Sequence, residues 1–120
     1  MLELSEERRL KRATPKDGRK ADRGKACALR PEQIQASSSL LKAIANENRL
    51  TILYLLREGE KSVLELGRSL ALRQPKVSQH LARLREEGIV ATRRDGQAIY
   101  YSLVCRKARR VIDLVERLYT

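Results

Sequence analysis

The sequence has little of what catalysis or a metal centre requires. Its 120 residues include one histidine, two cysteines, four tyrosines, no tryptophan and no phenylalanine. Cys27 and Cys105 belong to no Cys-x-x-Cys pair and no Cys/His cluster, so neither a disulfide framework nor a zinc finger is expected. No nucleophile–base pair and no glycine-rich phosphate loop is visible. We therefore expect no enzyme activity, no metal and no cofactor.

Long apolar runs are also lacking, which argues against a membrane protein. A spanning helix needs roughly 20 consecutive apolar residues, and no stretch approaches that length. The first seven residues, MLELSEE, lack the basic start and apolar core of a signal peptide. Sparse cysteine suits a reducing compartment. We expect a cytoplasmic protein.

The sequence has only 15 acidic residues against 26 lysines and arginines, which gives a net charge of +11. Such a balance favours a polyanionic partner. Residues 1–30 carry ten basic and five acidic side chains, a quarter of the length with nearly half of the net charge. We expect residues 1–30 to form a flexible basic extension and residues 31–120 to form one domain. The extension is either an arm that adds affinity for DNA or a solubilising tail.

Apolar residues recur at helical spacing in several segments. A first helix is expected from Pro31 and a second over residues 50–56, capped by residues 46–49 and ended by Gly59. Ser62 and Glu65 form a capping box for a third helix that stops near Leu72. Residues 106–119 predict a strongly apolar last helix. Because a core without Phe or Trp is thin, we expect a homodimer in which the first and last helices pair with those of a second copy.

Residues 72–85, LRQPKVSQHLARLR, form the stretch around which the domain is organised. Pro75 suits the first turn of a helix, and Val77, Leu81 and Leu84 mark one buried stripe. The other face has no acid before Glu86, and amides, a hydroxyl and basic groups are what base edges and phosphates accept. The side chains of this face are Gln74, Lys76, Ser78, Gln79, His80 and Arg83.

Two β-type runs follow Gly88, a candidate helix C-cap, and they flank Asp95-Gly96. This is a strong hairpin signal. Arg93 and Arg94 lie near its tip and alternate sides, so we expect only one of them to face DNA. The predicted fold is mainly α with a β-hairpin wing: a winged helix-turn-helix of four helices, two strands and a final helix.

This order of elements resembles the ArsR/SmtB family of bacterial winged-helix repressors over about residues 40–119. The most specific parts are ANENRL at residues 45–50, VSQHL at 77–81, and RRDG at 93–96 followed by two tyrosines. The resemblance implies a homodimer that binds a double-stranded DNA operator and leaves it when an inducer binds. It places Gln74, Lys76, Ser78, Gln79, His80 and Arg83 in the major groove. It places Arg93, Arg94 and Gln97 of the wing on the backbone or in the minor groove.

The family's inducer sites are not matched. Metal-responsive members carry a Cys-x-Cys pair in the third helix or Asp, His and Glu in the terminal helices; here residues 65–68 contain no thiol, and Asp113 and Glu116 lack a histidine partner. The sequence is more similar to the reactive-sulfur subgroup through EGEKSV at 58–63 and RQPKVSQHLARLREEG at 73–88. That subgroup senses with two cysteines, and the matching positions here are Tyr54 and Thr120. The resemblance therefore implies that this switch is absent from its usual place.

Three further interpretations stay open at this level. Cys105, at the start of the last helix, could form a thiol switch with Cys27, or both thiols could be incidental. His80 is either a DNA contact or a polar surface residue, and the basic cluster at 106–110 is either a DNA contact or a solvated helix face. A low-specificity architectural DNA binder is the remaining alternative in function.

Overall fold

The computed structural model describes residues 27–120, so the expectations for residues 1–26 lie outside the described part. Contacts divide the chain into two units, residues 1–36 and 37–120. In the first unit, residues 27–30 have no regular structure and lead into α3 (Pro31–Ile44), which begins at the expected residue. An ion pair joins Arg30 Nε to Glu32 Oε2 over 2.9 Å at the start of this helix.

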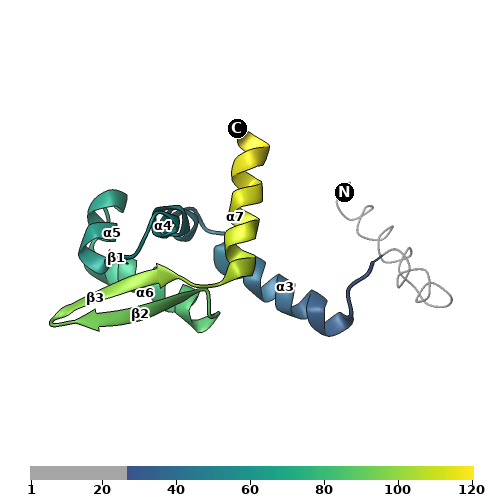
Figure 1. Cartoon of the computed structure of the whole chain (residues 1–120), viewed down its shortest axis with the longest axis horizontal. Coiled ribbons are helices and arrows are strands. Elements are labelled where there is room, and N and C mark those ends of the chain that lie inside the picture. Colours follow the sequence, from purple (N-terminus) through teal and green to yellow (C-terminus); the bar gives the residue numbers. More distant parts are fainter. Residues whose placement is uncertain (1–26) are drawn as a thin grey trace, which may run out of the picture. The chain divides into compact units, whose positions relative to one another are not determined.

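The second unit is a winged helix-turn-helix, as the sequence predicted. In Figure 1 the β2–β3 hairpin extends away from α7, and α6 lies beside the sheet. After the end of α3, the elements are α4 (Glu47–Arg57), β1 (Lys61–Ser62), α5 (Val63–Leu70), α6 (Gln74–Glu86), β2 (Val90–Asp95), β3 (Ala98–Leu103) and α7 (Arg106–Tyr119).

Side-chain caps determine where two of the helices begin. The Asn46 side chain accepts hydrogen bonds from the backbone N–H groups of Asn48 and Arg49, so α4 starts three residues before the expected Leu50. The capping box at α5 is confirmed: Ser62 Oγ accepts from Glu65 N over 3.1 Å, and Glu65 Oε1 accepts from Ser62 N over 2.8 Å. The backbone hydrogen bond lowers the pKa of Glu65.

A tight turn joins α5 to α6 and sets the angle between them. Ala71 adopts the left-handed conformation, with φ 56° and ψ 43°, and its N–H bonds back to the last carbonyls of α5. The turn comes close to α5 at Gly67, where a Cβ atom would lie 3.1 Å from the carbonyl oxygen of Leu72. Glycine at this position therefore lets the turn pack directly on α5.

The sheet has one strand that the sequence did not reveal. The strand order is β1-β3-β2, with Ser62 of β1 opposite Tyr100. The hairpin itself is as predicted, but its turn is shifted by one residue. Because Asp95 pairs with Ala98, the two turn residues are Gly96 and Gln97, and Gly96 has a φ of 66°. Tight hairpin turns need a positive φ at this first position, which glycine adopts at least cost.

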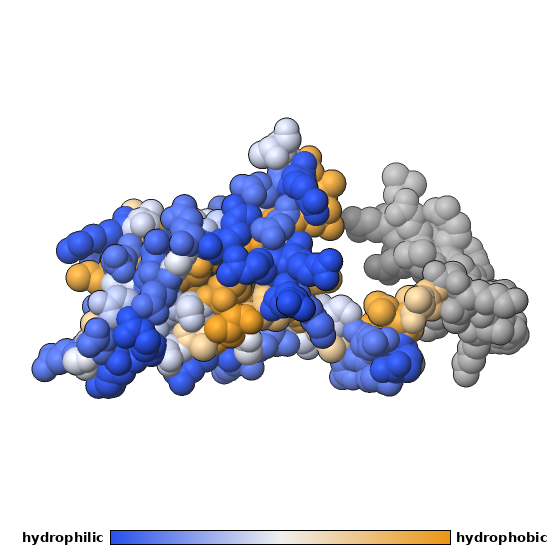
Figure 2. All heavy atoms as spheres, in the orientation of Figure 1, coloured by the Kyte–Doolittle hydropathy of each residue, from blue (hydrophilic) through white to orange (hydrophobic). Residues whose placement is uncertain are grey.

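The core is aliphatic, and the side chains that are almost completely buried come from four helices and the loop before β2. The largest of these are Ile52, Leu53, Leu66, Val77, Leu81, Leu84, Ile89 and Ile112. Within residues 27–120, none of the buried residues is polar or charged. In contrast, α7 exposes Leu114, Leu118 and Tyr119, and apolar side chains are visible along it in Figure 2.

No helix in residues 27–120 is long and apolar enough to cross a bilayer.

Candidate nucleic-acid interface

The polar face of α6 is held outward by its apolar stripe. Val77, Leu81 and Leu84 are completely buried. At 100° per residue, Gln79 then projects from nearly the opposite side of the helix. Of the six predicted contact residues on α6, four are exposed and His80 and Arg83 are half-buried. All six side chains are thus at least partly accessible on the sides of α6 that the core does not cover.

His80 lies at the edge of this surface, against α4. Its Nε2 atom is 3.5 Å from Asn48 Nδ2. Burial lowers the pKa of His80, and the positive charges of Arg49 and Lys76 lower it further. The imidazole is therefore mainly neutral at pH 7 in the free protein.

The beginning of α6 carries positive charge that no acid offsets. The first turn contains no acid, and the N-cap residue Arg73 makes no side-chain cap hydrogen bond. At the other end, Arg83 lies 3.6 Å from Glu87, which partly balances its charge. A helix N-terminus with cations and no carboxylate favours an anion such as a phosphate.

The two wing arginines have different surroundings. Arg93 is paired with Glu60: Nη2 lies 2.6 Å from Oε1 and Nε lies 3.2 Å from Oε2. Its guanidinium also stacks 4.9 Å from the centre of the Tyr100 ring. The ion pair raises the pKa of Arg93 and lowers that of Glu60. Arg94 is exposed and makes no ion pair with the described residues, and Gln97 is exposed at the hairpin turn.

Sequence reasoning missed two arginines beside α6. Arg68 and Arg73 border a groove of about 300 Å³ between α5 and α6, which Gln74 also lines. Both are exposed and neither forms an ion pair with another described residue. Arg73 directly precedes Gln74 in the sequence, whereas Arg68 is brought beside α6 by the tight turn at residues 71–73.

Cys105 has a structural role in this arrangement. Its Sγ atom accepts a hydrogen bond from Ala108 N over 3.4 Å and so caps α7. The side chain also packs against the core. Cys27 and Cys105 are both free thiols. The basic side chains of residues 106–110 show no ion pair to residues 27–120.

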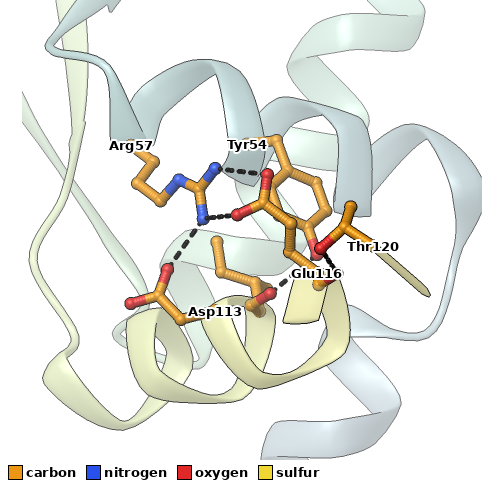
Figure 3. A network of polar contacts seen from close by, with 6 residues as sticks. Tyr54, Arg57, Asp113, Glu116 and Thr120 are labelled. Carbon is orange, nitrogen blue, oxygen red and sulfur yellow. Dashed lines mark hydrogen bonds and ion pairs between the residues drawn. The ribbon is translucent and has the colours of Figure 1, made fainter. Parts of the chain in front are cut away.

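The residues that the resemblance matches to inducer sites form hydrogen bonds and ion pairs within this chain. Tyr54 donates a hydrogen bond from its hydroxyl to the carbonyl oxygen of Ile112 over 2.8 Å, and Thr120 bonds back to Glu116 O (Figure 3). Asp113 and Glu116 both bind the guanidinium of Arg57. Among residues 27–120, no group of three or more potential metal ligands comes together.

Together, the helix pair α5–α6, the hairpin wing and the basic, acid-poor surface define a winged helix-turn-helix DNA-binding protein. Residues 46–92 match the family described as "Bacterial regulatory protein, arsR family". The transcriptional activator HlyU of Vibrio cholerae is 49% identical over 80 residues, which cover 67% of this chain and 74% of HlyU. The chain belongs to the arsR family, and it is a DNA-binding transcriptional regulator.

Other relatives and solved structures agree with this assignment. A biofilm growth-associated repressor of Agrobacterium fabrum is 45% identical over 80 residues, covering 67% of this chain and 68% of the repressor. The structure of HlyU from Vibrio cholerae superimposes with a TM-score of 0.72 at 43% identity, covering 75% of this chain and 98% of HlyU. The homodimeric winged helix-turn-helix domain Mb0332 of Mycobacterium bovis gives a TM-score of 0.67 at 28% identity and covers 87% of each chain.

Proposed function

We propose that the protein is a homodimeric repressor that binds an inverted-repeat operator through α6 and leaves it when an inducer binds. The observation that carries this proposal is the exposed face of α6, which combines amide, hydroxyl and basic groups with no acid in the first turn. Both an activator and a repressor occur among its relatives. Sequencing DNA recovered with the protein from cells, followed by reporter assays on the recovered sites, tests this function and its sign.

The contact residues divide into two roles in this proposal. Gln79 and its neighbours Gln74, Ser78 and His80 read base edges, while Lys76 and Arg83 bind phosphates beside the groove. Arg94 and Gln97 bring the wing to the backbone or the minor groove, and Arg93 supports the wing through Glu60. Arg68 and Arg73 add phosphate contacts on the side of the helix-turn-helix.

A comparison of two variants separates these roles. Gln79→Ala should lower the preference for the base pair that it contacts, at a cost of about 1–3 kcal/mol, and leave affinity for unrelated duplex nearly unchanged. Arg94→Ala should weaken binding to all duplexes alike and reduce the slope of log affinity against log salt by roughly one. Anisotropy titrations with operator and random duplex at several salt concentrations measure both effects. Identical behaviour of the two variants would contradict the assignment of α6.

Dimerisation through α3 and α7 is the second part of the proposal. The exposed Leu114 and Leu118 of α7 and Leu41 of α3 are half or more accessible in the single chain, although large apolar side chains gain free energy by burial. Homodimeric assembly of a structural neighbour supports a two-fold arrangement. Two-fold symmetry predicts half-sites about one helical turn of DNA, or a multiple of it, apart.

We further propose that the protein works in the cytoplasm without enzymatic activity, metal or cofactor. Its single histidine lies beside the proposed DNA-binding surface, and the carboxylates of α7 are engaged by Arg57. An architectural protein would bind all duplexes similarly. An operator should instead be preferred over random duplex by on the order of a thousandfold or more, and competition binding distinguishes the two.

A further inference from the structure

The last helix is attached to the DNA-reading part of the fold through one main neighbour. Among the described elements, α4 is the principal packing partner of α7, and α4 also packs on α5, α6 and β3. Only Ala108 and Ile112 of α7 are fully buried. Together with the partly buried Val111 they form a narrow contact, which by itself constrains rotation of a helix weakly.

Polar contacts beside Ala108 and Ile112 restrict the rotation of α7 further. Nη1 of Arg57, in the last turn of α4, lies 2.8 Å from Asp113 Oδ1 and 2.9 Å from Glu116 Oε1. Its Nη2 atom lies 3.1 Å from Glu116 Oε2, and its guanidinium stacks 5.0 Å from the centre of the Tyr54 ring. Figure 3 shows the two carboxylates converging on this one guanidinium. We call Tyr54, Arg57, Asp113 and Glu116 the α4–α7 clasp.

The geometry of the clasp restricts the rotation of α7 about its own axis. A guanidinium is a planar fork, and two acceptors three residues apart on one helix face can both meet it only over a small range of helix rotation. The hydroxyl of Tyr54, 2.8 Å from the carbonyl oxygen of Ile112, adds a third fixed point on the same stretch of α7. The hydrogen bonds from Arg57 also keep the pKa of Glu116 below its ordinary value, so this carboxylate stays charged at neutral pH.

We propose that Arg57 is a positioning residue that selects the spacing of operator half-sites. It does so by fixing the angle between α7 and the DNA-binding helix pair α5–α6. This inference rests on the proposed function, in which α7 pairs with α7 of a second copy. Any change of that angle is then applied twice, once in each protomer, and moves the two recognition helices relative to each other. Arg57 touches no DNA in this arrangement.

The test uses the full-length dimer and a set of duplexes. The operator is selected from random DNA by the wild-type protein, and its spacer is then varied by one or two base pairs in each direction. A duplex with a single half-site is the reference. For Arg57→Gln we expect affinity for the best spacing to fall about tenfold and the spacing preference to flatten, with half-site affinity unchanged. The double variant Asp113→Asn/Glu116→Gln should behave in the same way.

Three further variants serve as controls for the role of Arg57. Glu58→Gln removes one exposed charge next to Arg57 but outside the clasp and outside α7, and it should keep the wild-type spacing profile. The charge exchange Arg57→Glu/Glu116→Arg should recover part of the preference. Should Arg57→Gln fold poorly, Tyr54→Phe removes only the hydroxyl contact and should give a smaller flattening.

The outcomes separate this inference from the function on which it rests. If the wild-type protein forms dimers and prefers one spacing, and Arg57→Gln keeps that preference, the positioning role is wrong while the proposed function stands. If the wild-type protein is monomeric by sedimentation or binds all spacings alike, the proposed dimeric function fails and the inference fails with it.

Discussion

At the scale of single residues, the proposed contact between His80 and DNA predicts that operator affinity depends on pH. In the free protein its pKa is held below 6.5 by burial and by Arg49 and Lys76. Nearby phosphates favour the charged imidazole, so a complex in which His80 faces DNA raises this pKa and takes up a proton. Operator affinity should therefore increase as pH falls from 8 to 6, and His80→Gln should remove most of this dependence. Titrations at constant ionic strength measure it, and an unchanged pH profile would show that His80 does not face DNA.

The lowered pKa of His80 predicts the opposite pH dependence for the stability of the free protein. Because the folded state binds a proton at His80 less readily than the unfolded chain, this residue lowers stability as pH falls through about 6.5. His80→Gln should therefore lose less stability than the wild type between pH 7 and pH 5. Affinity and stability thus move in different directions, which distinguishes a DNA contact from a general acid effect.

Cys105 tests whether a thiol regulates this protein. Its sulfur caps α7 by accepting from Ala108 N, and serine is a better acceptor at the N-cap position. Cys105→Ser should keep the operator affinity of the wild type and unfold at a similar or higher temperature. Peroxide or polysulfide should shift operator binding of the wild type and of Cys105→Ser equally. A shift seen only in the wild type would establish the thiol switch instead.

At the scale of elements, the α5–α6 turn carries a removable strain. Ala71 has a φ of 56°, a conformation that costs a non-glycine residue about 1–2 kcal/mol. Ala71→Gly should therefore stabilise the protein by roughly 0.5–1 kcal/mol, after the greater freedom of glycine in the unfolded chain is subtracted. Ala82→Gly, at an exposed position inside α6, is the matched control and should destabilise by about 1 kcal/mol. Thermal unfolding of both variants would refute the idea if they changed stability in the same direction.

What the sequence could predict was largely local. The stripe of Val77, Leu81 and Leu84, the capping box and the hairpin each depend on residues within one or two turns of each other, and all three are present. Strand β1 was not predictable, because two residues cannot show the alternation that marks a strand. The start of α4 was misplaced because its apolar run begins after its first turn.

The contacts that the sequence could not predict join distant parts of the chain. Arg93 and Glu60 are 33 residues apart, and Arg57 and Asp113 are 56 apart. Two adjacent arginines in a sequence do not show which of them will form an ion pair. In the structure it is Arg93, which pairs with Glu60 and stacks on Tyr100 of β3. Likewise, the sequence does not show that an arginine of α4 pairs with the two carboxylates of α7.

At the scale of the whole molecule, the proposed dimer depends on the exposed apolar side chains of α7. Leu118 is 70% accessible in the single chain. If it is buried in the dimer, Leu118→Glu places a charge in an apolar contact, and the dimer should dissociate. A monomer engages one half-site at a time, so operator affinity should fall by about a hundredfold or more, while affinity for random duplex changes little.

Sedimentation provides the direct measurement of this last prediction. The wild-type protein should have twice the chain mass of 13.7 kDa, and Leu118→Glu should have the mass of one chain at the same concentration. Val104→Glu changes another exposed apolar residue outside α3 and α7 and should leave both mass and operator affinity unaltered. A Leu118→Glu protein that remained dimeric would show that the two copies meet on another surface, and the half-site spacing would then no longer depend on α7.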